Sequence, residues 1–381
     1  MQALATRLHS SISDIAPTAW DALANPASAA FNPFISHAFL WALEQSGSAT
    51  PKAGWQPTHI AMEEDGKLVA AAPAYVKAHS YGEYVFDHGW AQAFERAGGA
   101  YYPKLQIAVP FTPATGPRLL TGGRPHLLPV LSQAIKRICS ENELSSAHIT
   151  FETESESLTL AAQGFLQRHD QQFHWCNDGY KSFDDFLCAL SSIKRKNLKR
   201  ERREALSAGI EVDHITGTDL KEAHWDAFFR FYMDTGSRKW GSPYLTRRFF
   251  SLIGDAMPER ILLIMAKRAG NYIAGALNVL GSETIYGRNW GAIEHHPFLH
   301  FELCYYQAID YAIANGLSRV EAGAQGEHKL ARGYLPVRTY SSHWIAHAGL
   351  RDAVARYLDE ERRAIAENIE FLDEHSPFKR Q

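Results

Sequence analysis

Hydrophobic positions in the first half of the chain recur at helical spacing in some stretches and form short strand-like runs in others. These patterns predict helices at 18–24 and 37–47, strands at 57–63 and 67–77 with a turn at 64–66, a helix at 126–143, and a strand at 147–152. The first half is therefore expected to combine helices with a sheet that contains at least one hairpin.

The second half predicts the same succession of elements. We expect a helix at 225–236, three strands with intervening turns at 260–291, a helix at 302–316 that ends at Gly316, and a strand at 319–324. A final helix is predicted in 349–381.

Direct comparison of the halves favours an internal duplication. Residues 133–151 align with 307–325 apart from a small gap. The tripeptide GFL at 164 corresponds to GYL at 333, and the pair His-Trp at 174 corresponds to His-Trp at 343, so both matches are 169 positions apart. A common order with a constant offset indicates a repeat, which constrains the fold more than any single motif does.

Composition and charge narrow the class of protein. The 381 residues are 45% hydrophobic and 21% charged, as expected for a folded chain, and a net charge of −3 gives no global attraction to nucleic acid or anionic lipid. The four cysteines form no CxxC pair and resemble neither a zinc site nor a disulfide framework. No stretch has the length of a signal peptide core or a membrane span, so a cytoplasmic protein is expected. The oligomeric state stays open.

Three stretches carry a resemblance to a known family: HSYGEYVFDHGWAQAFERAGGAYYPKLQIAVPFTPATGPRLL at 79–120, YGRNWGAIEHHPFLHFELCYYQAIDYAI at 286–313, and GAQGEHKLARGYLPVRTYSSHW at 323–344. They resemble the FemAB-like tandem acyltransferases of the GNAT superfamily, which are linked to peptidoglycan biosynthesis. The resemblance covers nearly the whole chain. It implies an α+β fold, a mixed α/β architecture of two tandem GNAT-like (acyl-CoA N-acyltransferase) domains. Each domain would be a mixed, mostly antiparallel sheet flanked by helices.

The resemblance also implies domain bounds and a reaction. A first domain is expected at 1–180 with a long insertion at about 79–118, a second at 181–348 with the active cleft, and a C-terminal helix at 349–381. The implied activity moves an acyl group from acyl-CoA or aminoacyl-tRNA, each a co-substrate rather than a permanently bound cofactor, to an amine of a small molecule or cell-wall precursor. The alternative is a catalytically inactive GNAT-like module that binds a ligand or a protein.

The pyrophosphate loop typical of acetyl-CoA-dependent GNAT enzymes is incomplete in this sequence. The second half has HHPFLHFE at 295–302, with a proline and no glycine, where a glycine-rich loop would bind pyrophosphate. The first half has a fragment of such a pattern in Gly122, Gly123 and Arg124 before a predicted helix. We assign these three residues as the candidate phosphate-binding loop.

The stretch GAQGEHKLARGY at 323–334 concentrates functional groups just after a predicted strand. Acyl transfer to an amine needs a proton relay and donors for the developing oxyanion. Glu327 and His328 are the candidate relay, and the candidate substrate ligands here are Gln325, Lys329 and Arg332. Glu321 at the strand end faces the same predicted cleft. A glycine-rich turn with solvated charges is the alternative.

Two further clusters supply candidate substrate ligands in the second half. YGRNWG contains Tyr286, Arg288, Asn289 and Trp290, and strand alternation places Arg288 and Trp290 on one face and Asn289 on the other. HHPFLHFE contains His300 and Glu302, the latter expected to cap the helix or to orient an amine. No metal site is predicted, because Pro297 interrupts the helical spacing of the histidines.

Two segments have both a binding interpretation and a structural one. The insertion of the first half, which contains Lys104, is a candidate binding loop or an aromatic cluster that packs the loop down. Residues 194–203 include seven Lys or Arg. They could bind a phosphorylated substrate or, as the sharpest alternative, tRNA; a solvated helix face is the third possibility.

Overall fold

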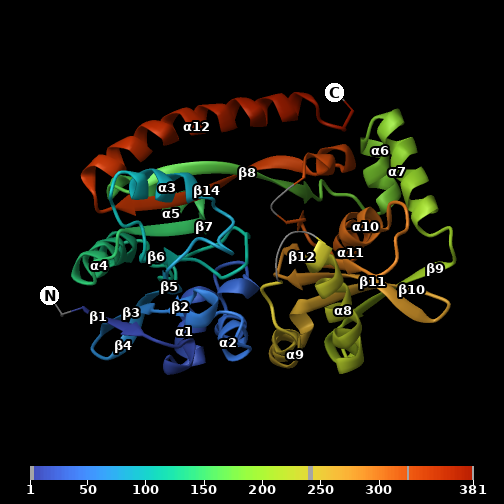
Figure 1. Ribbon diagram of the computed structural model, residues 1–381. Coiled ribbons are helices and arrows are strands. Elements are labelled where there is room, and N and C mark those ends of the chain that lie inside the picture. Colours follow the sequence, from blue (N-terminus) through green and yellow to red (C-terminus); the bar gives the residue numbers. More distant parts are fainter. Residues whose placement is uncertain (1–3, 239–242, 324–325, 380–381) are drawn as a thin grey trace. The chain divides into compact units, whose positions relative to one another are not determined.

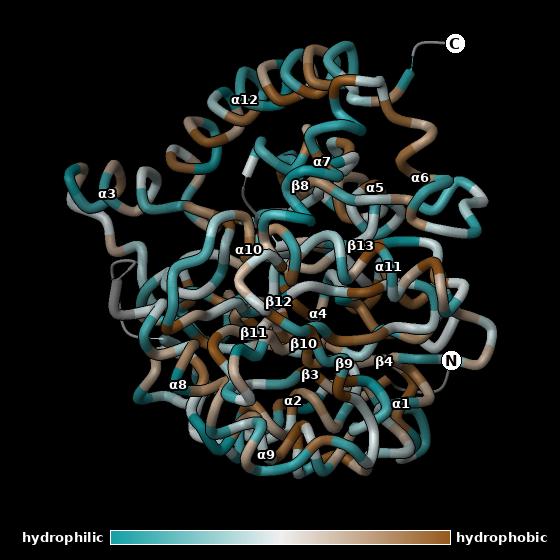
Figure 2. The backbone as a smooth tube through the Cα atoms, turned by 90° about the vertical axis from the view of Figure 1, so that its right-hand side faces the viewer, coloured by the Kyte–Doolittle hydropathy of each residue, from teal (hydrophilic) through white to brown (hydrophobic). Residues whose placement is uncertain are grey.

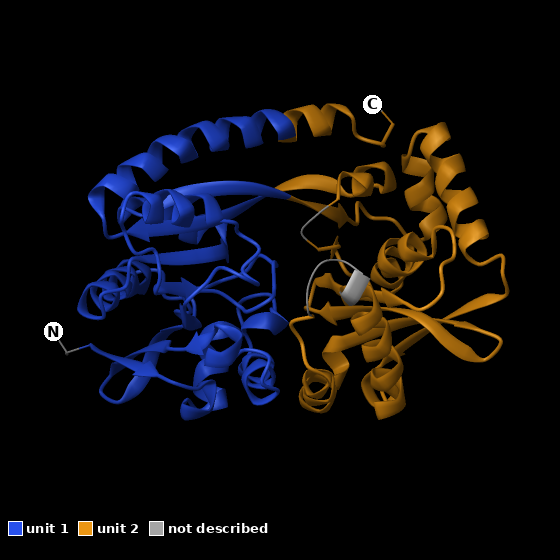
Figure 3. Cartoon of the chain, viewed as in Figure 1, with its two compact units in different colours: residues 1–171, 338–368 blue, residues 172–337, 369–381 orange. Residues whose placement is uncertain are grey.

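The computed structural model describes residues 4–238, 243–323 and 326–379 (Figure 1). The chain divides into two compact units: residues 1–171 with 338–368, and residues 172–337 with 369–381 (Figure 3). We call them unit 1 and unit 2. Two of the divisions fall inside long strands, β8 (Leu166–Cys176) and β14 (Leu335–Ile345), and the third falls inside α12 (Ala348–Glu374). The domain bounds expected from the sequence are at 180 and 348.

Unit 1 contains a small antiparallel sheet in the order β1-β3-β4 and a mixed sheet in the order β2-β5-β6-β7-β14. Its strands besides β14 are β1 (Ala5–His9), β2 (Gln56–Pro57), β3 (His59–Glu64), β4 (Lys67–Ala72), β5 (Ala74–Lys77), β6 (Lys104–Ile107) and β7 (Ser146–Glu152). The single strand predicted at 67–77 is two strands, because Pro73 has no N–H to donate and separates β4 from β5.

The predicted insertion of unit 1 is not a loop throughout. It contains α3 (His88–Arg96) and the central strand β6, which is antiparallel to β5 and parallel to β7. The sequence does not reveal β6 because all four of its residues are buried, so the strand has no alternation of polar and apolar positions. The segment predicted as an insertion therefore contributes a strand to the centre of the unit 1 sheet.

Helices cover the sheets of unit 1 with amphipathic faces. They are α1 (Pro17–Ala24), α2 (His37–Gln45), α3, α4 (Leu127–Glu141), α5 (Glu154–Ala162) and the first part of α12 (Ala348–Glu374). Leu131, Ile135 and Ile138 of α4 bury one stripe in the same core as the strand residue Ile149. Figure 2 shows α12 alternating between hydrophobic and hydrophilic segments along its length.

Unit 2 is a sheet in the order β8-β13-β12-β11-β10-β9 with helices around it. The strands are the end of β8, β9 (Ile210–Thr216), β10 (Ile261–Arg268), β11 (Asn271–Leu280), β12 (Thr284–Ala292) and β13 (Arg319–Glu321). The helices are α6 (Phe183–Ala189), α7 (Ser192–Ala205), α8 (Glu222–Arg238), α9 (Arg247–Ala256), α10 (Leu299–Phe301), the π-helix η6 (Glu302–Tyr306), α11 (Gln307–Ala314) and the 3-10 helix η7 (Glu327–Arg332). The three strands predicted at 260–291 are confirmed.

The chain contains two successive repeats of one order of elements, the first ending with β8 and the second with β14. Each has a strand, two helices, a series of strands, a helix, a strand, a short helix and a final strand. The final strands are exchanged between the repeats. β8 is the last strand of the first repeat and pairs with β13 of unit 2. β14 is the last strand of the second repeat and pairs with β7 of unit 1. Among the described residues, no helix has both the length and the apolar composition needed to cross a bilayer.

Candidate active site

The sheet of unit 2 opens between its two parallel strands. β12 and β13 pair over three positions only, ending at Tyr286 and Glu321. Gly287 then passes close to the end of β13, since a Cβ at this position would lie 3.3 Å from the carbonyl oxygen of Glu321. A side chain at 287 would push the two strands apart at the point where their separation begins.

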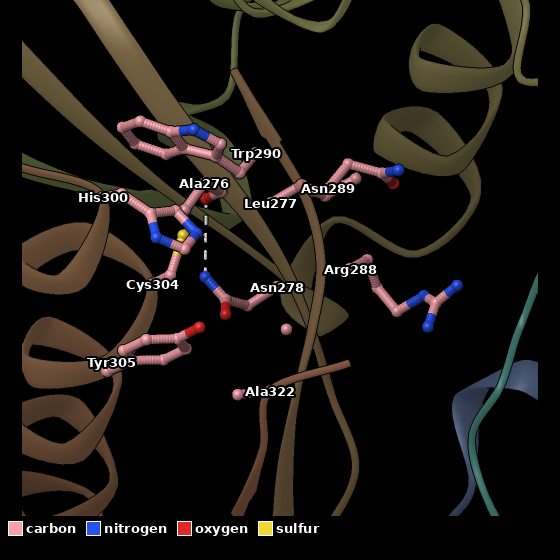
Figure 4. A pocket seen from close by; sticks show the side chains of 11 residues that line it. Ala276, Leu277, Asn278, Arg288, Asn289, Trp290, His300, Cys304, Tyr305 and Ala322 are labelled. Carbon is pink, nitrogen blue, oxygen red and sulfur yellow. Dashed lines mark hydrogen bonds between the residues drawn. The ribbon is translucent and has the colours of Figure 1, made fainter. Parts of the chain in front are cut away.

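A β-bulge reshapes β12 next to this opening. Leu277 of β11 lies opposite Asn289, and Asn278 lies opposite Gly287, so Arg288 is the extra residue. The bulge breaks the alternation expected from the sequence. Figure 4 shows Arg288 and Asn289 directed to the same side, away from the helix wall that carries His300 and Tyr305, whereas Trp290 lies against His300. The predicted pairing of Arg288 with Trp290 on one face is therefore wrong.

A cavity of about 110 Å³ occupies the opening (Figure 4). Its main polar and aromatic lining residues are Asn278, Arg288, Asn289, Trp290, His300, Cys304 and Tyr305. The last three come from α10 and the π-helix, and the wider π turn lets the consecutive residues Cys304 and Tyr305 face the same space. Trp290 and His300 also line a second cavity of about 350 Å³ near the start of α10.

The predicted relay residue His328 contacts a cavity residue. Its Nε2 lies 2.9 Å from the hydroxyl of Tyr305, while the imidazole ring is exposed to solvent. Burial raises the pKa of the Tyr305 phenol, which keeps this hydroxyl protonated. Glu327, the other predicted relay residue, is exposed. The structure thus connects His328 to the cavity through Tyr305, a residue that the sequence analysis did not single out.

Glu321 is the carboxylate closest in sequence to the opening, directly before the cavity residue Ala322. It is 4% exposed, and burial raises its pKa to about 7 against the opposing effect of Arg319. Its Oε1 forms an ion pair with Arg319 at 3.2 Å. Its Oε2 lies 3.8 Å from Nε2 of His174 and has no hydrogen-bond partner among the described residues. A buried carboxylate oxygen without a donor indicates a site that a substrate could complete.

Tyr286, the residue opposite Glu321, is buried and contributes little to the opening itself. Burial and the nearby Glu321 raise its pKa to about 12. Gln325, which was expected to face the same cleft, lies outside the described residues.

Lys329 and Arg332 are buried and have partners inside unit 2. The Nζ of Lys329 donates to the carbonyl oxygen of Gly323 at 2.8 Å, and burial lowers its pKa to about 8. The guanidinium of Arg332 donates to both carboxylate oxygens of Glu201 at 3.0 Å and lies 3.5 Å from the centre of the Phe301 ring.

Glu302 is also used inside the fold. It is fully buried and pairs with Arg202 of α7 at 2.9 Å, and Gln307 donates to it at 2.7 Å. Its predicted capping role is wrong, because the N-cap of α10 is Phe298. The pairs Glu302–Arg202 and Arg332–Glu201 hold α7 against the π-helix and η7, so we leave Glu302 and Arg332 out of the proposed substrate site.

Loss of the Arg202 side chain should destabilise unit 2. In Arg202→Ala, the carboxylate of Glu302 stays buried without its cation, which we expect to cost about 2–3 kcal/mol of unfolding free energy. Chemical denaturation measures this difference. Arg203→Ala is the matched control, because Arg203 is an exposed neighbour on the same helix. Equal stability of the two variants would contradict a structural role for the pair.

The candidate residues of unit 1 are held by internal contacts. Lys104 is 0% exposed, and its Nζ donates to Glu83 at 2.7 Å and to Asp87 at 2.5 Å. Arg124 donates to the carbonyl oxygens of Thr121 and Val69. Two more loop residues, Gly122 and Gly123, border a cavity of about 300 Å³, and the N–H of Gly122 donates to Leu23. These contacts use the Arg124 guanidinium that was expected to bind phosphate.

Four residues near the opening were missed or not assigned a role from the sequence: His174, Asn278, Cys304 and Tyr305. The run ELCYY at 302–306 reads as an ordinary helix, and a π turn has no sequence signature that would place two consecutive residues at one cavity. The sequence shows His174 only as part of the repeated His-Trp pair.

Comparison with known proteins agrees with this architecture. No curated protein matches the chain significantly in sequence. Among solved structures, FemX is 13% identical with a TM-score of 0.53, over 82% of this chain and 93% of that one. L-PGS from Bacillus licheniformis is 10% identical with a TM-score of 0.51, over 86% and 98%. A tandem GNAT protein from the clavulanic acid biosynthesis pathway is 10% identical with a TM-score of 0.47, over 91% and 99%.

The similarity to FemX shows a shared fold, and the predicted mixed α+β fold that resembles tandem GNAT domains is confirmed. The family model described as peptidoglycan biosynthesis/recognition matches residues 11–380. This match includes both units and every residue that lines the opening between β12 and β13. The chain therefore belongs to the FemAB-like family.

Proposed function

We propose that this protein is an N-acyltransferase that moves an acyl group from an activated donor, an acyl-CoA or an aminoacyl-tRNA, to an amine of a cell-wall precursor. The observation that carries the proposal is the opening between β12 and β13. It is a cavity lined by Tyr305, with Glu321 directly before its lining residue Ala322. The family description supports a cell-wall substrate.

Amide formation needs one group that removes a proton from the attacking amine and another that protonates the leaving group. Glu321 suits the first role, because a pKa of about 7 leaves a large fraction of the carboxylate available near neutral pH. Tyr305 suits the second, because its phenol stays protonated and contacts His328, whose exposed ring can exchange protons with solvent. We place the relay at Tyr305 and His328 rather than at Glu327, which is exposed.

The remaining cavity residues would hold the substrates. Arg288 and Asn289 are half-buried and directed away from the helix wall (Figure 4), where a guanidinium and an amide can bind a carboxylate or phosphate. Trp290 and His300, with ring centroids 5.2 Å apart, form the wall shared by the two neighbouring cavities of unit 2. An aromatic wall of this kind, with the two rings edge to face, suits the apolar part of an acyl donor.

The direct test is a single-turnover assay with labelled acyl-CoAs and aminoacyl-tRNAs, in the presence of peptidoglycan precursors that carry a free amine. Transfer of label to the amine with at least one donor is the expected result. Tight binding of a donor or precursor without any transfer would favour the alternative, a module that binds without catalysis; the glycine-free start of α10 is the observation in its favour.

The two candidate donors, aminoacyl-tRNA and acyl-CoA, can be distinguished by how the affinity of binding depends on salt. The exposed cations of α7 include Lys196, Arg200 and Arg203. If aminoacyl-tRNA binds along this helix, its affinity should fall steeply as salt rises, because phosphate contacts release counterions. A flat salt dependence would remove tRNA from the proposal and leave acyl-CoA.

Removing the Tyr305 hydroxyl should slow the transfer. We expect Tyr305→Phe to lower the single-turnover rate by about 10²-fold, since a positioned general acid contributes roughly this much. The ring remains to fill the wall, so donor affinity should change little. Tyr311→Phe is the control, because Tyr311 lies in α11 of the same helical segment and does not line the cavity. An unchanged rate in Tyr305→Phe would rule out this phenol as the acid.

A further inference from the structure

The cavity in the sheet opening contains a nucleophile that the proposed proton transfers do not use. Cys304 lines it from the π-helix, directly before Tyr305. Figure 4 shows the Cys304 sulfur, the Asn278 amide and the Tyr305 hydroxyl on the same side of β12. Thiols attack thioester and ester carbonyls readily once they lose their proton.

A second residue in the cavity points independently to a ligand. Asn278 is 1% exposed, and its Nδ2 donates to the carbonyl oxygens of Leu262 and Ala276. Its Oδ1 has no hydrogen-bond partner among the described residues, although the side chain lines the cavity. Leaving a buried acceptor unsatisfied is costly, so the cavity is suited to a ligand group that donates an N–H, such as an amine.

The same unit supplies a buried amine near this cavity. Lys329 of η7 is 1% exposed, and its Nζ donates to the carbonyl oxygen of Gly323, the residue after the cavity residue Ala322. Burial lowers the pKa of its amine to about 8. A lysine amine that is partly neutral can accept the proton of a thiol that attacks a carbonyl carbon.

We propose that Cys304 carries the acyl group as a covalent thioester between the donor and the acceptor half-reactions, with Asn278 holding the attacking amine. The inference rests on the proposed transferase function of the same site and gives the order of its steps. The donor would be an acyl thioester or an aminoacyl ester.

In the first half-reaction, the Cys304 proton moves to Lys329 and the thiolate attacks the donor carbonyl carbon. The new bond joins this carbon to Sγ, the bond to the donor sulfur or oxygen breaks, and the leaving group takes the Tyr305 proton, which is then replaced by the proton on Lys329. In the second, an N–H of the amine donates to Oδ1 of Asn278 while the nitrogen attacks the acyl carbon. The bond to Sγ then breaks, Glu321 takes the proton lost by the amine, and Tyr305 gives its proton to the thiolate. Both groups return to their starting states by proton exchange with solvent.

The test is intact-mass measurement of the full chain after incubation with the acetyl and alanyl thioesters of N-acetylcysteamine, followed by peptide mapping. We expect one acyl group per chain on Cys304. It should be absent in Cys304→Ala and retained in Cys176→Ser and Cys188→Ser, which replace exposed thiols outside the cavity. Lys329→Met should slow the alkylation of Cys304 by iodoacetamide by at least about tenfold, a readout that does not depend on the donor.

Three results would overturn the inference: no acyl group on Cys304 with either thioester, no alkylation of Cys304 by iodoacetamide, or amide formation by Cys304→Ala at the wild-type rate. None of them removes the proposed transferase function, which fails only if the wild-type protein forms no amide with any donor. Amide formation by the wild type together with its loss in Cys304→Ala would support both.

Discussion

Replacing Glu321 with Gln should lower the single-turnover rate of acyl transfer by about 10³-fold, the middle of the range for a positioned general base. The substitution keeps the size of the side chain and removes its ability to accept a proton. In the wild type, the rate should rise as pH passes through about 7, where the Glu321 carboxyl loses its proton. The variant should lack this rise.

The raised pKa of the Glu321 carboxyl also predicts how the free energy of unfolding depends on pH, which can be measured without a substrate. The pKa of Glu321 is raised from 4.5 to about 7 by burial, so between these values the unfolded chain has released a proton that the folded chain retains. Stability present below pH 4.5 is therefore lost as pH rises toward 7. Glu321→Gln should remove this component from a series of denaturation curves.

Glu259→Gln is a suitable control for both experiments, because Glu259 lies in the 3-10 helix before β10 and not at the ends of β12 and β13 that border the opening. A normal transfer rate in Glu321→Gln would exclude Glu321 as the base. An unchanged pH dependence of stability would show that the carboxyl is ionised in the folded protein well below pH 7.

Lys104→Met should destabilise unit 1 by about 3–5 kcal/mol, because it leaves the buried Asp87 carboxylate without its lysine and Glu83 with only the longer pair to Lys77 at 3.8 Å. Lys104 donates to Glu83, Asp87 and the hydroxyl of Ser80, and all four residues are buried. Burial raises the pKa of Glu83 to about 7 even with Lys104 present. For Asp87, burial acts in the same direction, but the Lys104 ammonium and His148 outweigh it and hold the pKa low.

The unfolding free energy lost in Lys104→Met should depend on pH, and the charges of the two carboxyls determine the direction of this dependence. Without Lys104, both carboxyls would have higher pKa values in the folded state than in the unfolded state, so protonation favours the folded variant. The difference from wild type should therefore shrink as pH falls from 8 toward 5. Denaturation at pH 8 and pH 5 measures it, with Lys67→Met as a control at an exposed lysine of the same unit. A loss below 1 kcal/mol at pH 8 would show that the cluster does not depend on this ammonium.

The fold was predictable where a local pattern has a single solution. The strands at 260–291 are long, apolar and separated by glycine turns, and the constant offset of 169 residues revealed the repeat. The offset also links Glu152 and Glu321, the last residues of β7 and β13. The exchange of β8 and β14 was not predictable, because hydrophobic patterns show that a strand exists but not which sheet it joins.

The candidate site was predictable by region and less so by residue. The sequence located the strand YGRNWG and the stretch after β13, both of which border the opening. The sequence assigned too many charged groups to substrate binding. Arg332 and Glu302 instead form ion pairs with residues more than 90 positions away in the sequence. It missed Cys304 and Tyr305 because their role depends on a π turn, and it misplaced Arg288 because a bulge interrupts the strand.

The most direct measurement is a crystal structure of the protein with a hydrolysis-resistant acyl donor, such as a CoA ketone in which a methylene replaces the thioester sulfur. The carbonyl group of this analogue should lie between β12 and β13, within hydrogen-bond reach of the Tyr305 hydroxyl. Binding only at the unit 1 cavity beside Gly122 and Gly123, with the opening empty, would contradict the assignment of the active site to unit 2.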